Sequence, residues 1–178
     1  MVMSMIFSIL VFINEVNAFF KSQKQLPVPN EVHNLLFYIQ RDPDSNTVCY
    51  TLNVNENGQF NEKEPVNIFW VRYAEGGNRK ELNYLQRKFG YGLKIKANGI
   101  NQFEIRPVAY PKRALILKRN KENKFQVHTS INRRDCILKN VFIRIDGGSA
   151  VSPNVKYIEL HGTDSVTGET VMEKVMIS

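Results

Sequence analysis

The sequence predicts a single, mainly antiparallel β domain, and three observations lead to that fold class. Short segments rich in β-branched and aromatic residues recur along the chain. Clusters of Asp, Asn and Gly separate many of them, as hairpin turns require, at 42–46, 55–58, 97–101, 120–123 and 164–168. The length of 178 residues suits one domain with its own core. We expect a closed β-barrel or a β-sandwich, and favour a lipocalin-like barrel.

About ten segments have the composition of strands: 34–41, 47–54, 66–73, 92–97, 102–108, 114–119, 124–130, 136–146, 155–162 and 170–177. Segment 66–73 is apolar on both faces until Arg72, which is typical of a central strand. Segments 136–146 and 155–162 each pair one apolar face with one of mixed polar and aromatic character. That mixed face is either an exposed sheet surface or the lining of a barrel mouth or groove.

One short helix is expected among the strands. Asn78 and Glu81 have capping-box spacing, and Gly90 supplies a stop. The spacing of Leu82, Leu85 and Phe89 places them on one face, so we expect this face to pack on the sheet. The polar residues on its free face are Arg79, Lys80, Asn83, Gln86 and Arg87.

The first residues indicate export. The apolar run 5–13 is too short to span a bilayer, and Val16-Asn17-Ala18 fits a signal-peptidase site. We therefore expect a signal peptide at 1–18, an extended lead-in at 19–32 and a single β domain at 33–178. The protein would then be periplasmic or secreted, with no transmembrane segment after signal removal. An uncleaved anchor or an N-terminal strand is the alternative.

Cys49 and Cys136 are the only cysteines. In an oxidising compartment they could form one disulfide that closes a long loop. Each also lies in an apolar, strand-like segment, where a free cysteine behaves as a small hydrophobic residue. Both readings stay open at the level of sequence.

Charge and motifs narrow the function classes. The chain has 24 Lys and Arg against 17 Asp and Glu, a net charge of +7, which favours anionic partners. Export argues against nucleic acid among them. The histidines His33, His128 and His161 lack metal-ligand spacing, so we expect no metal and no cofactor. Segment 146–154 lacks the nucleophile-elbow pattern, and 75–80 lacks phosphate-loop spacing.

The candidate site follows from Arg72, because a guanidinium at the rim of an apolar core requires a partner. Internal partners would be Glu159, Asp146 or Glu104. Otherwise the partner would be a ligand carboxylate or phosphate, held by Arg72 and Arg144 together. The expected ligand-binding residues are Arg72, Arg87, Tyr91, Arg144, Tyr157, Glu159 and His161.

These residues favour non-enzymatic binding of an anionic or amphipathic small molecule in the cell envelope. The main alternative is an interaction protein that docks another envelope protein or polymer through a basic face. A third reading is an enzyme that uses Tyr157, Glu159 and His161.

Three segments carry a resemblance to a known family: "NLLFYIQRDPDSNTVCYTLN", "PVNIFWVRYAEGGNRKELNYLQRKFGYG" and "YIELHGTDSVTGETVMEK". Together they resemble domain-of-unknown-function family 4833, a family of short exported bacterial proteins, over residues 33–175. The matching features are Asn34, Trp70 with Arg72, Tyr91 with Gly92, and the stretch 159–164. The resemblance implies one domain and export, and it implies no activity, cofactor or ligand.

Overall fold

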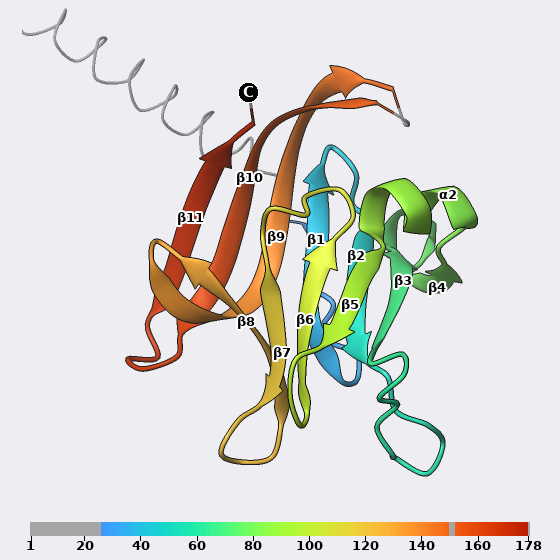
Figure 1. Ribbon diagram of the computed structural model, residues 1–178. Helices are drawn as coiled ribbons and strands as arrows, with labels where there is room; N and C mark the ends of the chain where they lie inside the picture. Colours follow the sequence, from blue (N-terminus) through green and yellow to red (C-terminus); the bar gives the residue numbers. More distant parts are fainter. Residues whose placement is uncertain (1–25, 150–151, 178) are drawn as a thin grey trace, which may run out of the picture.

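The computed structural model describes residues 26–149 and 152–177, and within them eleven strands form one sheet (Figure 1). The predicted signal peptide at 1–18 lies outside the described residues and stays a prediction. The strands are β1 (Leu35–Asp42), β2 (Thr47–Leu52), β3 (Val66–Arg72), β4 (Asn78–Glu81), β5 (Leu93–Ala97), β6 (Gln102–Pro107), β7 (Leu115–Arg119), β8 (Phe125–Ile131), β9 (Arg134–Gly148), β10 (Pro153–Asp164) and β11 (Thr170–Met176). The three helical turns are η1 (Tyr73–Glu75), α2 (Tyr84–Gln86) and η2 (Arg87–Tyr91). The mainly β class is confirmed.

The long strand β9 organises the sheet. One of its edges pairs with β10, which carries β11, and the opposite edge pairs first with β8 and then, in parallel, with β1. Two arms therefore leave the same edge of β9, one running β8-β7-β6-β5 and the other β1-β2-β3-β4. The arms curl toward each other, so that β5, β6 and β7 lie in front of β1, β2 and β3 (Figure 1). The outer strands β4 and β5 do not pair, so the sheet is an open half-barrel and the expected closed barrel is wrong.

The main core fills the space between the two arms. Phe37 and Tyr50 stack at 4.2 Å on one side, and Ile105, Leu117 and Val127 are fully buried on the other. Such alternate residues face inward because successive side chains of a strand point to opposite faces. A smaller cluster around Cys49, Phe69 and Val71 lies on the opposite, outer face of the β1–β3 arm.

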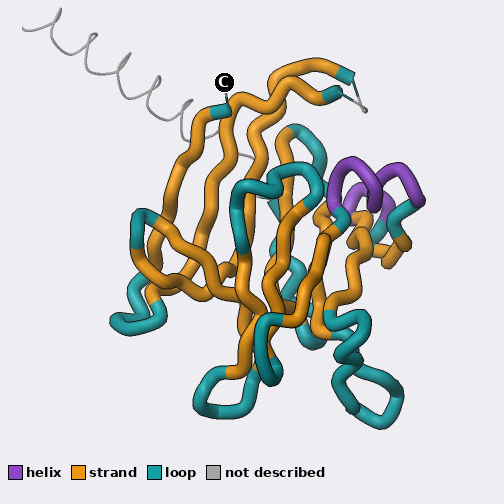
Figure 2. Tube along the Cα trace, viewed as in Figure 1, coloured by secondary structure: helices purple, strands orange, loops and turns teal. Residues whose placement is uncertain are grey.

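The expected helix over 78–90 is corrected by the structure. Gly76 and Gly77 both have positive φ, near 80°, and turn the chain back so that 78–81 pairs with β3 as β4. The helical segment begins later, where Asn83 and Gln86 form the capping box that we had assigned to Asn78 and Glu81. It is a single turn of α-helix followed by a π-helical turn, shown in purple at the rim in Figure 2.

Residues 26–32 lie against the outer face of the β1–β3 arm. The side chain of Gln40 donates to the carbonyl of Pro27 at 2.7 Å, and the hydroxyl of Tyr73 donates to Glu31 at 2.7 Å. Val32 packs on the outer cluster. Among the helices of the described residues, none is both long and apolar enough to cross a membrane.

Candidate functional site

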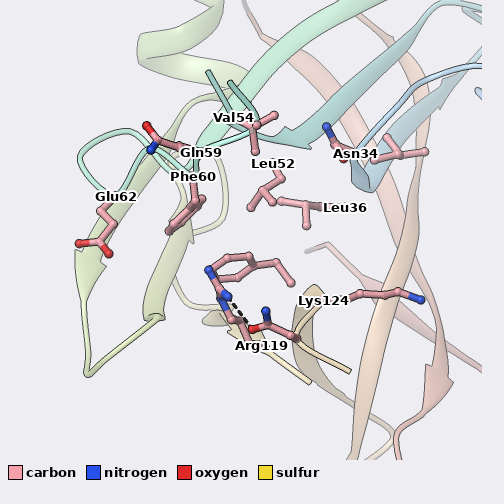
Figure 3. Close-up of a pocket in the computed structure, with 13 residues that line it drawn as sticks. Asn34, Leu36, Leu52, Val54, Gln59, Phe60, Glu62, Arg119 and Lys124 are labelled. Atoms are coloured by element: carbon pink, nitrogen blue, oxygen red, sulfur yellow. Dashed lines mark hydrogen bonds between the residues drawn. The ribbon is translucent and has the colours of Figure 1, made fainter. Parts of the chain in front are cut away.

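A pocket of about 760 Å³ lies between the two arms, at one end of their strands (Figure 3). One side is formed by the start of β1, the end of β2 and the loop that follows β2. The other side is formed by the turn between β7 and β8. The lining residues are Asn34, Leu35, Leu36, Leu52, Val54, Gly58, Gln59, Phe60, Glu62, Arg119, Asn123, Lys124 and Phe125. The volume is within the range of roughly 300 to 1,000 Å³ that is typical of small-molecule sites.

Two asparagine-based turns shape the rims of this pocket. The side-chain oxygen of Asn55 accepts from the backbone N–H groups of Asn57 and Gln59, at 3.0 and 2.8 Å. The side-chain oxygen of Asn120 accepts likewise from the backbone N–H groups of Glu122 and Lys124, at 3.0 and 2.9 Å. Because these side chains satisfy the backbone donors of their own turns, the rims hold a defined shape. Both turns were expected from the sequence, but without a function.

The inner wall of the pocket is apolar. The ring of Phe60 lies 4.3 Å from that of Phe125 and 5.7 Å from that of Phe103, so it bridges the two arms. In Figure 3 the side chains of Leu36, Leu52 and Phe60 face a common space, with Arg119 below them. This wall can accommodate the hydrocarbon part of a ligand.

Three charged residues line the pocket, Glu62, Arg119 and Lys124, and Arg119 is the one that stacks on an aromatic ring of the pocket. Its guanidinium carbon lies 4.6 Å from the centre of the Phe125 ring, and its Nη1 donates to the side chain of Asn123 at 2.5 Å. Its Nε is buried and has no hydrogen-bond partner among the described residues. No carboxylate of the described chain lies within 4.0 Å of its nitrogens, whereas the neighbouring Lys124 pairs with Glu122 at 3.1 Å. Arg119 therefore presents a positive charge with unused donors beside an apolar wall.

Of the seven residues predicted from the sequence, four come together on the outer face of β9 and β10: Arg144, Tyr157, Glu159 and His161. Tyr157, Glu159 and His161 form a network with Lys174 of β11, whereas Arg144 pairs separately with Asp42. The carboxylate of Glu159 lies 3.0 Å from Lys174 and 3.4 Å from His161, and it raises the pKa of the Lys174 amine through a hydrogen bond. The Lys174 amine also lies 3.8 Å from the centre of the Tyr157 ring. The Glu159 carboxylate and the Lys174 amine therefore form an ion pair on the outer sheet face.

Arg72 and Arg144 do not converge. Arg72 follows Ile68 and Trp70 by the two-residue alternation of β3, which places it on the inner face, and it pairs with Glu75. Arg144 is opposite Asp42 in the β1–β9 ladder and pairs with it on the outer face. The internal partners we had expected for Arg72 were therefore wrong, although an acidic partner is present.

The remaining predicted residues, Arg87 and Tyr91, have structural contacts. Arg87 bonds to Glu81 at 3.0 Å and to the carbonyl of Ile68 at 3.3 Å. The ring of Tyr91 meets Trp70 edge-on at 5.1 Å, and burial raises the pKa of its hydroxyl. Both residues attach the helical segment to the rim of the sheet.

Cys49 and Cys136 are free and buried. Cys49 belongs to the outer cluster and Cys136 to the inner core, so the sheet separates their side chains. A disulfide between them would require the two strands to be rebuilt. Burial, with Glu31 nearby, raises the pKa of the Cys49 thiol to about 12, so it is not a reactive thiolate at neutral pH.

One cluster that the sequence did not suggest joins His128, Asp135 and Ser165. The Nδ1 of His128 lies 3.1 Å from Asp135, and the Ser165 hydroxyl donates to the same carboxylate at 2.9 Å. Because Ser165 bonds to the carboxylate and not to the imidazole, this is not a nucleophile–base pair. Within residues 26–149 and 152–177, no group of three or more His, Cys, Asp or Glu side chains is arranged to hold a metal ion.

The fold and the pocket define a small β protein with a curled, two-armed sheet and a ligand-sized pocket at one end. The sequence model of one family, described as domain of unknown function (DUF4833), matches residues 37–174. The chain therefore belongs to this family, as its sequence segments suggested. No curated protein and no solved structure matches the chain.

Proposed function

We propose that this protein binds an amphipathic anion without chemical conversion, in the pocket between Phe60 and Arg119. The main observation in support of this proposal is the position of the Arg119 guanidinium. It has no carboxylate partner among the described residues and borders a cavity of about 760 Å³ with an apolar wall. An anionic head group would meet Arg119, and a hydrocarbon tail would lie along Phe60, Leu36 and Leu52.

The geometry of Arg119 suits a carboxylate. Its Nη1 is used by Asn123, whereas Nε and Nη2 form no hydrogen bond with the described residues. These two nitrogens lie on one edge of the planar guanidinium, the arrangement that binds two carboxylate oxygens in parallel. A buried donor without a partner is unfavourable, so a ligand oxygen here would gain more than it would at an exposed lysine.

The compartment we propose is the cell envelope or the exterior. This rests on the apolar run 5–13 and the sequence Val16-Asn17-Ala18, together with the +7 net charge. Lipids, fatty acids and acidic metabolites are available there as anionic ligands.

The enzymatic alternative has weaker support. Tyr157, Glu159 and His161 do lie together, but Glu159 is held between Lys174 and His161 on an open face. A general acid or base works best in a water-poor cleft with a free position for substrate. The pocket beside Arg119 contains none of these three residues.

Calorimetric titration with decanoate and with uncharged decanol tests the proposal. Arg119→Met keeps the apolar stem and removes the charge. We expect it to weaken decanoate binding by at least about tenfold, because it removes both charge-assisted hydrogen bonds to the carboxylate. Decanol binding should change little. Phe60→Ala should weaken the binding of both ligands.

The matched control is Lys121→Met, which removes a cation from the same turn but not from the pocket lining. It should bind decanoate as the unmodified protein does. The proposal is wrong if the unmodified protein binds neither ligand, or if the Arg119 and Lys121 variants lose decanoate binding equally.

A further inference from the structure

The helical segment α2–η2 exposes three large apolar side chains, and two of them, Leu85 and Phe89, were expected from the sequence on a buried helix face. Tyr84 is 69% exposed, Leu85 57% and Phe89 63%. Only Leu82, at 6%, enters the core as expected. Soluble proteins expose single apolar residues routinely, but three within six positions form a patch that suggests a partner.

The sequence around this patch is rich in cations and poor in carboxylates. Six Lys and Arg residues lie between Asn78 and Ala97, against the single carboxylate of Glu81. Glu81 is shared by Arg79 at 2.9 Å and Arg87 at 3.0 Å. Lys80 and Lys88 have no acidic partner within 4.0 Å among the described residues. Lys80 and Lys88 therefore leave uncompensated positive charge on or next to the segment that carries the three apolar side chains.

The lysine at the centre of the patch lies beside its aromatic rings. The Lys88 amine is 5.4 Å from the ring centre of Tyr84 and 5.3 Å from that of Phe89. Aromatic side chains flanked by lysines are suited to the boundary between water and lipid, where rings reach the head-group level and amines contact phosphate oxygens.

The fold holds this segment out from the sheet. The π-helical turn ends at Gly92, where a Cβ would collide with the carbonyl of Arg87. The edge contact of Tyr91 with Trp70 fixes the base of the turn. Figure 1 shows α2 at the end of the molecule opposite the loops that form the pocket. Docking through α2–η2 would therefore leave the pocket accessible.

We infer that Tyr84, Leu85 and Phe89, with Lys80 and Lys88, form a docking surface for an anionic lipid bilayer. The charge favours a lipid surface over a second copy of this chain, because two such patches would bring like charges together. Apolar insertion and electrostatic attraction each give weak binding alone, and their combination gives stable attachment.

The test is flotation of the protein without its predicted signal peptide 1–18, with vesicles of phosphatidylcholine containing phosphatidylglycerol, compared with vesicles of phosphatidylcholine alone. We expect binding to the anionic vesicles only, weakened by salt. The combined change Leu85→Ser and Phe89→Ser, and separately Lys80→Gln with Lys88→Gln, should each lower partitioning about tenfold or more.

The control is Ile100→Ser with Val166→Ser, which removes two apolar side chains that are 95% and 89% exposed elsewhere. It should bind vesicles normally, and all variants should keep the melting temperature and the decanoate affinity of the unmodified protein. Absence of binding to anionic vesicles, or an equal loss in the control, would overturn the inference. A change in the oligomeric state of the patch variants without a change in their vesicle binding would overturn it as well.

Discussion

Replacing Tyr50 with Phe should loosen the link between the two arms of the sheet. Tyr50 is 1% exposed on β2, and its hydroxyl donates at 2.8 Å to the carbonyl of Tyr91, immediately before β5. Phenylalanine keeps the ring and therefore the stacking on Phe37. The change consequently removes one interaction that joins segments 41 positions apart in the chain.

The expected loss of stability follows from the carbonyl that is left without its donor. A part-buried acceptor without a partner costs about 1 to 3 kcal/mol. For a domain of this size each kcal/mol corresponds to roughly 2 to 4 °C in melting temperature. We expect the lower half of the range in free energy, because Tyr91 lies near the rim, where water can replace the lost donor.

Urea unfolding followed by tryptophan fluorescence measures this effect. Trp70 is the only tryptophan, is 4% exposed and contacts Tyr91, so its emission reports on this junction. Tyr38→Phe is the control, because the Tyr38 hydroxyl makes no hydrogen bond within the described residues, and its effect should stay within about 0.5 kcal/mol. An unchanged unfolding midpoint in Tyr50→Phe, or an equal loss in the control, would refute the reasoning.

Two further predictions concern titratable groups. Burial lowers the folded-state pKa of His128 below 6.5, although Asp135 opposes the shift. The unfolded chain therefore binds the proton more tightly than the folded protein does. The free energy of unfolding should fall as the pH drops through 6.5 toward that lower pKa. In urea unfolding, His128→Gln should reduce this dependence of the free energy of unfolding on pH. Cys49 and Cys136 should react with a thiol reagent only after unfolding, and reductant should leave the melting temperature unchanged; fast labelling of the native protein would contradict their burial.

The strands were predictable because their signals are local. All ten expected segments are strands, since alternating apolar residues and Asp-, Asn- or Gly-rich turns act over a few positions. The order and pairing of the strands in the sheet were not predictable. The parallel pairing of β1 with β9 joins residues about a hundred positions apart, and it places β1 beside β8 on one edge of β9. Local patterns contain no information on such pairings.

The expected helix over 78–90 shows the same limit of local sequence patterns. The spacing of Leu82, Leu85 and Phe89 correctly marked apolar positions, but spacing cannot distinguish a buried stripe from an exposed one. The Gly76-Gly77 turn explains why 78–81 is a strand and not the start of a helix, because two residues with positive φ reverse the chain. The partner of Arg72 is the nearby Glu75, three positions along the chain across η1, which a search among distant carboxylates missed.

The pocket was missed because its rims were recognised only as turns. Asn55 and Asn120 were recognised as turn formers, and each turn is followed by a phenylalanine, Phe60 and Phe125. That repeated arrangement, with Arg119 beside the second turn, was the available signal. Proximity of the two turns required the curl of the sheet, which only the tertiary structure shows.

Titration of isotope-labelled protein with decanoate, followed by amide chemical shifts in NMR, tests the central claim most directly because it locates the ligand. The account predicts saturable shifts concentrated in 52–60 and 119–125, on both rims of the pocket. Arg119→Met should require a higher decanoate concentration for the same shifts. Shifts concentrated around Arg144, Tyr157 and His161, or no saturable shifts at all, would contradict the account.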